Sequence, residues 1–220
     1  MNGILTFMDS YGGVILGWAL GLGSVLLNDW LRERKNRRQT KEAIAVELGE
    51  VGYRLLLTVY VTERHFGNGD RKLLEWMHPL LQKYEGLNPK EGILAVVSES
   101  LKLNDVQLQQ VAEAGRAADP PHINYPRIEV PYTTTAAMTQ ANSFEPDYAR
   151  MVLDILSHMR MLNEMHDNVF FYERLTFTPG LTEKNYKEAI KGKHTAQTEM
   201  SFRSRIIVDK ITALEQKYPS

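Results

Sequence analysis

The chain has 220 residues, of which 24% are charged and 43% are hydrophobic, and its formal net charge is −1 at pH 7. This balance is typical of folded proteins and excludes a wholly disordered chain, while the length suits one membrane segment plus one domain. Because the chain has no cysteine, disulfides, thiolate nucleophiles, cysteine-based zinc sites and iron–sulfur clusters are excluded.

The first feature along the chain is an uncharged, mostly apolar run from Ser10 to Asn28, SYGGVILGWALGLGSVLLN, bounded by Asp9 and Asp29. As a helix this run would extend about 28 Å, close to the hydrocarbon thickness of a bilayer. The run therefore predicts a transmembrane helix. A buried central helix of a soluble protein and a helix lying in the membrane interface are the two alternatives.

A basic juxtamembrane segment, residues 32–41, follows the apolar run directly. It contains six cations, Arg32, Arg34, Lys35, Arg37, Arg38 and Lys41, whereas residues 1–31 contain no lysine or arginine. Such a segment stays in the cytoplasm, and an uncharged start does not fit a secretory signal peptide. The six cations would contact anionic lipid headgroups or, in an oligomer, hold a polyanion at the cytoplasmic mouth of a pore.

These features predict a single-pass membrane protein with its N-terminus outside. Residues 1–31 would form a short outside tail and the transmembrane helix, and residues 42–220 a cytosolic helical-bundle domain.

Three glycines, Gly13, Gly17 and Gly21, are spaced four residues apart within the run. This GxxxGxxxG spacing places them in one line on one helix face, where a second helix can approach closely. We therefore expect a homo-oligomer that assembles through this helix. In such an oligomer Asp9 would form a ring of carboxylates at the outer mouth; the alternative is a carboxylate that is simply solvated among the headgroups.

Apolar residues continue to recur at helical spacing after the basic segment, so the first helix is expected to end near Phe66. The glycines at 67 and 69 supply a stop. A second helix is expected over 70–84, with a break or kink at Pro79. A third is expected from the cap Asn88 to about residue 101, and a fourth from the cap Asn104 to about residue 118.

Residues 119–143 contain four prolines, which oppose helix formation, so a long loop is expected there. Ser143 is expected to cap a helix over 144–177. After a turn at Thr178-Pro179-Gly180, a last helix is expected from Thr182 to about residue 217. These lengths and spacings predict an all-α fold, with an up-and-down helical bundle after the transmembrane helix.

Residues 42–220 contain 20 basic and 24 acidic residues, a balance that argues against a general nucleic-acid coat and leaves room for local basic patches. In the last helix, Lys184, Lys187, Lys191 and His194 form a line at spacings of three and four. Candidates to join them in holding the phosphates of a nucleotide or oligonucleotide and stacking a base are Arg203, Tyr125, Arg127 and Tyr132. The alternative is an ordinary solvated helix face.

Two groups of residues could suggest a metal site. Glu75 and His78 have the Glu-x-x-His spacing of di-iron bundles, but the second copy that such a site needs is absent. Asp154, His158 and His166 share one face, although a histidine in a bundle is more often a hydrogen-bonded structural residue. Because no phosphate-binding glycine loop, nucleophile elbow or HExxH motif occurs, we expect no enzyme, no cofactor and no metal.

The layout, which combines the glycine-rich run at 10–28, the basic exit at 32–41 and a helical domain, resembles the membrane effectors of bacterial anti-phage systems. It is most similar to the channel partner of Hailong-type pairs. The resemblance lies in the architecture and in no stretch of sequence identity. It implies an ion channel or depolarising pore as the output and a nucleotide or oligonucleotide as the ligand that gates it.

Two hypotheses about function follow. The first is a homo-oligomeric, ligand-gated membrane effector. The second is a non-conducting anchor or scaffold whose helical domain binds a cytosolic partner protein, because Ser24 is the only polar residue between Gly12 and Leu27 that could wet a pore. A metal-dependent enzyme is a third and less favoured alternative.

Overall fold

The computed structural model describes the backbone of residues 2–116 and 127–219, and the side chains of residue 21, 24–116, 127–140 and 142–219. Within those residues the fold has seven α-helices and one short 3₁₀ helix, and no strand. The prediction of an all-α helical fold is therefore confirmed. The chain divides into two compact units, Met1–Glu42 and Ala43–Ser220, which are described in turn.

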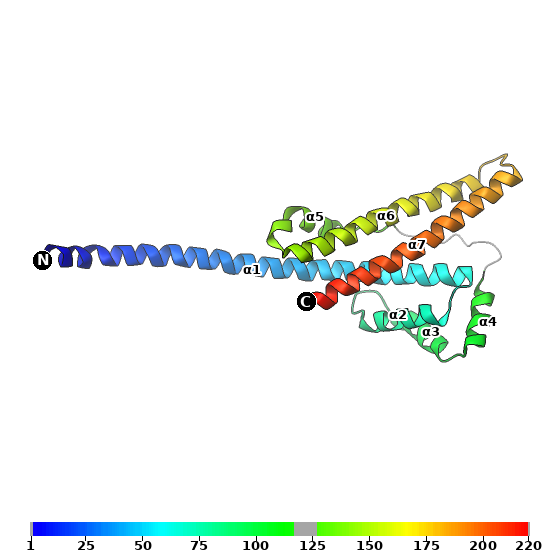
Figure 1. Cartoon of the computed structure of the whole chain (residues 1–220), viewed down its shortest axis with the longest axis horizontal. Coiled ribbons are helices and arrows are strands. Elements are labelled where there is room, and N and C mark those ends of the chain that lie inside the picture. Colours follow the sequence, from blue (N-terminus) through cyan, green and yellow to red (C-terminus); the bar gives the residue numbers. More distant parts are fainter. Residues whose placement is uncertain (1, 117–126, 220) are drawn as a thin grey trace. The chain divides into compact units, whose positions relative to one another are not determined.

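The helices follow one another along the chain with short connections between most of them (Figure 1). They are α1 (Asn2–Phe66), α2 (Arg71–Lys83), α3 (Glu91–Leu101), α4 (Asp105–Gly115), α5 (Pro131–Thr139), the 3₁₀ helix η1 (Ala141–Ser143), α6 (Pro146–Thr176) and α7 (Glu183–Lys217). The predicted end of the first helix at Phe66 is confirmed, and Gly67 follows it with a φ of 76°, the left-handed conformation that glycine adopts without strain.

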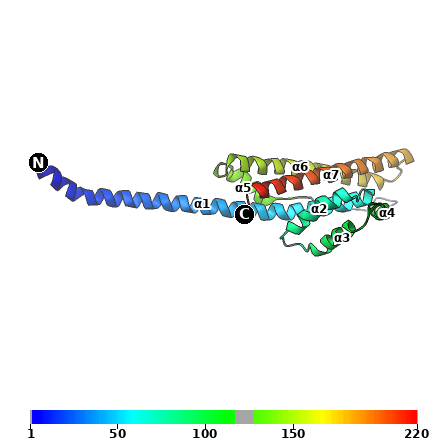
Figure 2. The same ribbon diagram turned by 60° about the horizontal axis from the view of Figure 1, so that its bottom comes forward.

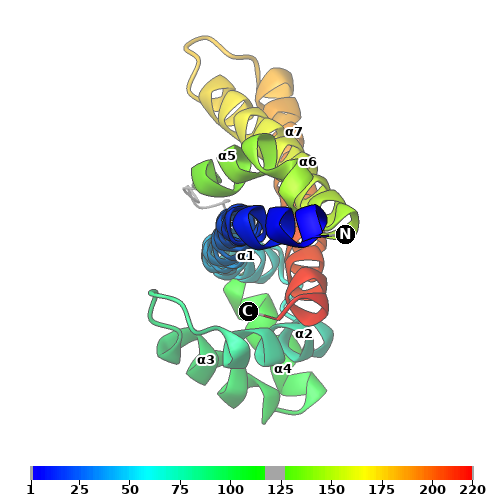
Figure 3. The same cartoon turned by 90° about the vertical axis from the view of Figure 1, so that its left-hand side faces the viewer.

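The second unit is built around the part of α1 that begins at Ala43. Its predicted inward face is buried: Ile44, Leu48, Val51, Leu55 and Val59 are each at most 4% exposed. In Figures 1 and 3, α2, α3 and α4 lie on one side of this part of α1, and α5 and α6 lie on the other. Because helices pack on more than one side of α1, its buried apolar face is wider here than the face of a helix that has a single partner.

Helices α6 and α7 form a long antiparallel pair, visible in two orientations in Figures 1 and 2. The predicted turn at Thr178–Gly180 is confirmed, and Gly180 has a φ of 76°. The last helix starts at Thr182 as predicted, and Thr182 caps it, since its side-chain oxygen accepts a hydrogen bond from the backbone N–H of Asn185 at 3.3 Å. Ile155 on α6 and Ile207 on α7 are both completely buried.

Pro79 does not break α2, contrary to the prediction. The helix continues from Arg71 to Lys83 with this proline inside it. The proline side chain is exposed, whereas Met77 and Leu81 on either side of it are completely buried. Burial of the apolar face thus outweighs the backbone hydrogen bond that proline cannot donate.

Asn88 does not cap α3, which is a second correction. The residue before α3 is Lys90, and no side chain caps the helix there. The amide of Asn88 instead donates to the carboxylate of Glu50 on α1 at 2.5 Å, and Glu50 also accepts the backbone N–H of Leu87 at 2.6 Å. Asn88 therefore bonds to a carboxylate that is distant in the sequence, and it does not cap the neighbouring helix.

The segment expected to be a loop at 119–143 contains a helix, α5, and η1 in its described part. Pro131 does not prevent α5, because it is the first helical residue, where a proline costs no hydrogen bond. Glu47 on α1 replaces the missing cap: its two carboxylate oxygens accept the backbone N–H groups of Tyr132 and Thr133 at 3.2 and 2.6 Å. Similarly, α6 begins at Pro146 without the predicted Ser143 cap.

Replacing Glu47 with alanine is expected to lower the free energy of unfolding by about 1 kcal/mol, the usual effect of losing a helix cap. Urea unfolding of the detergent-solubilised chain measures this change. Glu75→Ala is the matched control, because Glu75 is an exposed carboxylate on α2. Equal shifts for the two variants would contradict the capping role of Glu47.

In the first unit, the surroundings of Gly21 and of residues 24–42 are described. Val25, Leu26, Leu27, Trp30 and Leu31 are 50–70% exposed, and a Cβ placed on Gly21 would meet nothing within 4 Å. Within the described residues, no helix has a stretch both long enough and apolar enough to cross a membrane. Most of the predicted span, including Asp9, Gly13 and Gly17, lies outside the described side chains.

The six cations of the basic segment lie on α1. Arg32, Arg34 and Lys35 are exposed, and the guanidinium of Arg34 lies 5.5 Å from the centre of the Trp30 ring. Arg37 pairs with Glu33 at 3.3 Å and Arg38 with Glu42 at 2.7 Å, each across one helical turn. Such exposed pairs contribute little to stability.

Candidate functional site

Three of the four residues in the predicted basic line on α7 are exposed, and the fourth is not. Lys184, Lys187 and Lys191 are exposed, and Lys187 pairs with Glu183 at 2.6 Å. His194, the fourth member, turns inward instead: its Nε2 atom is buried without a hydrogen-bond partner, and its ring stands edge-on to Phe66 with centres 5.4 Å apart. The structure therefore supports a line of three lysines, and His194 belongs to the interior.

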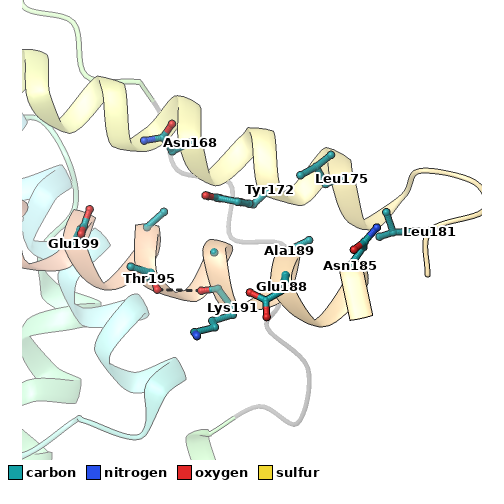
Figure 4. Close-up of a pocket in the computed structure, with 12 residues that line it drawn as sticks. Asn168, Tyr172, Leu175, Leu181, Asn185, Glu188, Ala189, Lys191, Thr195 and Glu199 are labelled. Carbon is teal, nitrogen blue, oxygen red and sulfur yellow. Dashed lines mark hydrogen bonds between the residues drawn. The ribbon is translucent and has the colours of Figure 1, made fainter. Parts of the chain in front are cut away.

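Beside this line, a cleft of about 650 Å³ lies between α6 and the first half of α7, within the size range of small-molecule sites. Figure 4 shows Asn168, Tyr172 and Leu175 on α6 facing Ala189 and Thr195 on α7. The remaining lining residues are Leu181, Asn185, Glu188, Lys191, Gly192, Ala196 and Glu199.

The Tyr172 ring lies directly against the backbone of Gly192. A Cβ placed on Gly192 would be 2.4 Å from the ring, far closer than atoms can approach. A residue without a side chain is therefore required opposite Tyr172, unless the ring moves. This contact gives the cleft one flat aromatic wall.

The charges around the cleft are mixed. Glu188, Glu199 and Lys191 line it, and in Figure 4 the lysine side chain extends away from α6 rather than into the gap. A row of phosphates would therefore be poorly neutralised inside the cleft and would meet the lysines only on the outer face of α7. The interior suits a flat, polar and largely uncharged group that can lie on Tyr172.

The other predicted ligand residues are not gathered at this cleft. Arg127 lines a second cleft, of about 870 Å³, between α5 and α6, and its guanidinium lies 3.7 Å from Asp167. Tyr132 is 44% exposed at the start of α5. Arg203 hydrogen-bonds to Nδ1 of His158 at 3.1 Å. Tyr125 lies outside the described residues.

The second cleft contains a feature that the sequence pattern did not indicate. The Asn163 side chain accepts the backbone N–H of Ile128 at 3.0 Å and donates to the Ile128 carbonyl at 2.8 Å. This double hydrogen bond ties the extended segment before α5 to α6. An asparagine at that helical position carries no sequence signal of its role, because its partner is a backbone group 35 residues away.

The residues considered for metal binding have other partners. His78 Nε2 lies 3.2 Å from the Ser98 hydroxyl, and Lys210 donates to Asp154 at 2.5 Å. The pKa of His158 is lowered, mainly by burial and then by Lys210. Among the residues with described side chains, no group of three or more His, Asp or Glu is placed to hold a metal ion.

Comparisons with protein-family models, with curated proteins and with solved structures found no match to this chain. The function is therefore argued from the residues and their arrangement alone.

Proposed function

We propose that the chain is a homo-oligomeric single-pass membrane effector whose second unit, on the cytosolic side of a bacterial inner membrane, senses a ligand. The observation that carries this proposal is the uncharged run of residues 10–28, followed within a few residues by six cations. An apolar helix of that length fits a bilayer, and the cations would hold its end in the cytoplasm.

The exposed residues at the end of the run add support. Val25, Leu26 and Leu27 are consecutive, so on a helix they point in different directions, yet all three are more than half exposed. Trp30 lies one turn further on, where an amphipathic aromatic side chain suits the membrane–water interface. Apolar side chains exposed all round a helix need lipid or other helices to cover them.

Self-association through the glycine face and control by a ligand complete the proposal. The helix α1 contains both the proposed span and, from Ala43, the central helix of the second unit. A ligand that favours one arrangement of α6 and α7 around that helix would shift the populations of the oligomer. The proposed ligand is a nucleotide or oligonucleotide, with phosphates on the lysines of α7 and a base on Tyr172.

Changing Lys184, Lys187 and Lys191 together to glutamine is expected to weaken binding of a short oligonucleotide by about tenfold or more, since each phosphate contact contributes through charge. Fluorescence anisotropy with a labelled oligonucleotide at 50 and 200 mM salt measures the affinity and its salt dependence. Changing Lys72, Lys83 and Lys102 to glutamine is the matched control, because it also removes three exposed lysine charges. If both variants bound equally, the α7 line would not be the phosphate contact.

The alternative is a non-conducting anchor, which is favoured by the hydrogen bond of the Ser24 hydroxyl. Its hydroxyl donates to the carbonyl of Gly21 at 2.8 Å within the same helix, so its proton is not offered to water or ions. Recordings of the purified protein in planar bilayers separate the two functions. The effector should conduct under some ligand condition, whereas an anchor should give no current under any.

A further inference from the structure

The end of α1 contributes a buried histidine to the second unit. His65 is 7% exposed, and its ring centre lies 5.4 Å from that of Phe66. Phe66 in turn contacts the ring of His194 on α7 at 5.4 Å. The last turn of α1 therefore meets α7 through an edge-on contact between Phe66 and His194, and the His65 ring is tilted against Phe66 on the same helix.

A buried lysine lies next to these rings. Lys193, on α7, is 3% exposed, and its Nζ atom lies 3.8 Å from Oε2 of Glu173 on α6. The Glu173 side chain is itself only 15% exposed. A buried ammonium requires a carboxylate partner, and Glu173 supplies it for Lys193.

Protonation of the two imidazoles is disfavoured in this environment. Burial lowers the pKa of His65, and the neighbouring His194 and Lys193 lower it further. Burial and Lys193 also lower the pKa of His194, whose Nε2 has no hydrogen-bond acceptor.

We infer that His65, Lys193, His194 and Glu173 form an acid-sensitive latch, which holds the end of α1 against α6 and α7 at neutral pH and releases it when both imidazoles become charged. Three cations would then lie close together in the interior, and separation of α1 would return them to water. This inference concerns the second unit alone and does not depend on the proposed membrane function.

The direction of the pH effect follows from the lowered pKa values. In the unfolded or released chain these histidines titrate near 6.5, and in the closed latch they titrate lower. The closed state is therefore fully favoured above about pH 6.5. Its advantage shrinks as the pH falls from there through the lowered pKa values, because only the released state binds the protons readily.

Hydrogen–deuterium exchange on the full chain in detergent, at pH 7.5 and 5.5, tests the latch. Protection factors, corrected for the intrinsic pH dependence of exchange, are expected to fall about tenfold or more at pH 5.5 in peptides covering 59–66 and 189–197. Peptides covering 44–51 serve as the internal reference and should keep their protection. Unchanged protection at the end of α1 would overturn the inference.

Two further measurements keep the test decisive. The double variant His65→Gln/His194→Gln should lose the pH dependence, whereas His78→Gln, which alters a histidine on α2 that faces Ser98 of α3, should retain it. If the loss of protection persisted in the double variant, the latch would be wrong. Proton NMR titration of the unaltered protein should give midpoints below 6.5 for both histidines, and a midpoint at or above 6.5 for either would also overturn the inference.

Discussion

Gly17→Ile is expected to convert the detergent-solubilised oligomer into single chains. The substitution places a branched side chain at the centre of the GxxxGxxxG line, where a second helix would have to approach within backbone contact. Native mass spectrometry measures the mass of the complex directly. Loss of the oligomer should also abolish any ligand-dependent current in planar bilayers, because a single helix encloses no pore.

Ala19→Ile is the matched control for this prediction. Two residues along a helix correspond to a rotation of about 200°, so Ala19 lies on the face opposite to Gly17. The control should leave the mass of the complex unchanged. Oligomers of the same size with Gly17→Ile would contradict an interface along the glycine line.

Ile207→Ala is expected to lower the free energy of unfolding by about 2–5 kcal/mol, the usual cost of truncating a fully buried aliphatic side chain. Ile207 is completely buried on α7, within the core of the second unit. Urea unfolding of the full chain, followed by circular dichroism, gives the change. A loss below about 1 kcal/mol would mean that the core collapses around the gap or that α7 is not packed as described.

Gln197→Leu provides a contrast on the same helix. The Gln197 side chain is completely buried, and neither its amide nitrogen nor its amide oxygen has a hydrogen-bond partner. Since an unpaired buried amide is costly, replacing it with leucine is expected to leave stability unchanged or to raise it by about 1–3 kcal/mol. Destabilisation as large as that of Ile207→Ala would show that the amide has a partner.

Helical periodicity and the local stop and cap signals at Gly67 and Asn104 were predicted correctly from the sequence. The stripe from Ile44 to Val59, the stop at Gly67 and the caps Asn104 and Thr182 all depend on residues within one or two turns of one another. Asn104 even forms the full capping box with Gln107. Interactions this local can be recognised without knowing what lies across the fold.

The wrong predictions for Asn88 and for the loop at 119–143 share a cause, which is a partner distant in the sequence. Glu47 and Glu50 look like ordinary surface carboxylates of α1, yet the first caps α5 and the second holds the connection between α2 and α3. Glu63 behaves likewise, accepting a hydrogen bond from Ser201 on α7 at 2.6 Å. Three carboxylates of one helix thus anchor three other parts of the unit.

The candidate site shows the same limit. The spacing of the α7 lysines correctly predicted a common exposed line, because spacing alone decides which residues share a helix face. The position of His194 depended on Phe66, at the end of a helix more than 100 residues earlier, and could not be read from α7. Likewise, the contact between Tyr172 and Gly192 requires two helices to be placed side by side before it is visible.

The most direct test of the central proposal uses the natural absence of cysteine. Single cysteines are introduced at Asn2, before the proposed span, and at Val106, an exposed residue on α4. Intact spheroplasts are then treated with a membrane-impermeant maleimide. A single-pass protein with its N-terminus outside predicts labelling of Asn2→Cys in intact cells and of Val106→Cys only after lysis. Labelling of both, or of neither, before lysis would contradict the proposed topology.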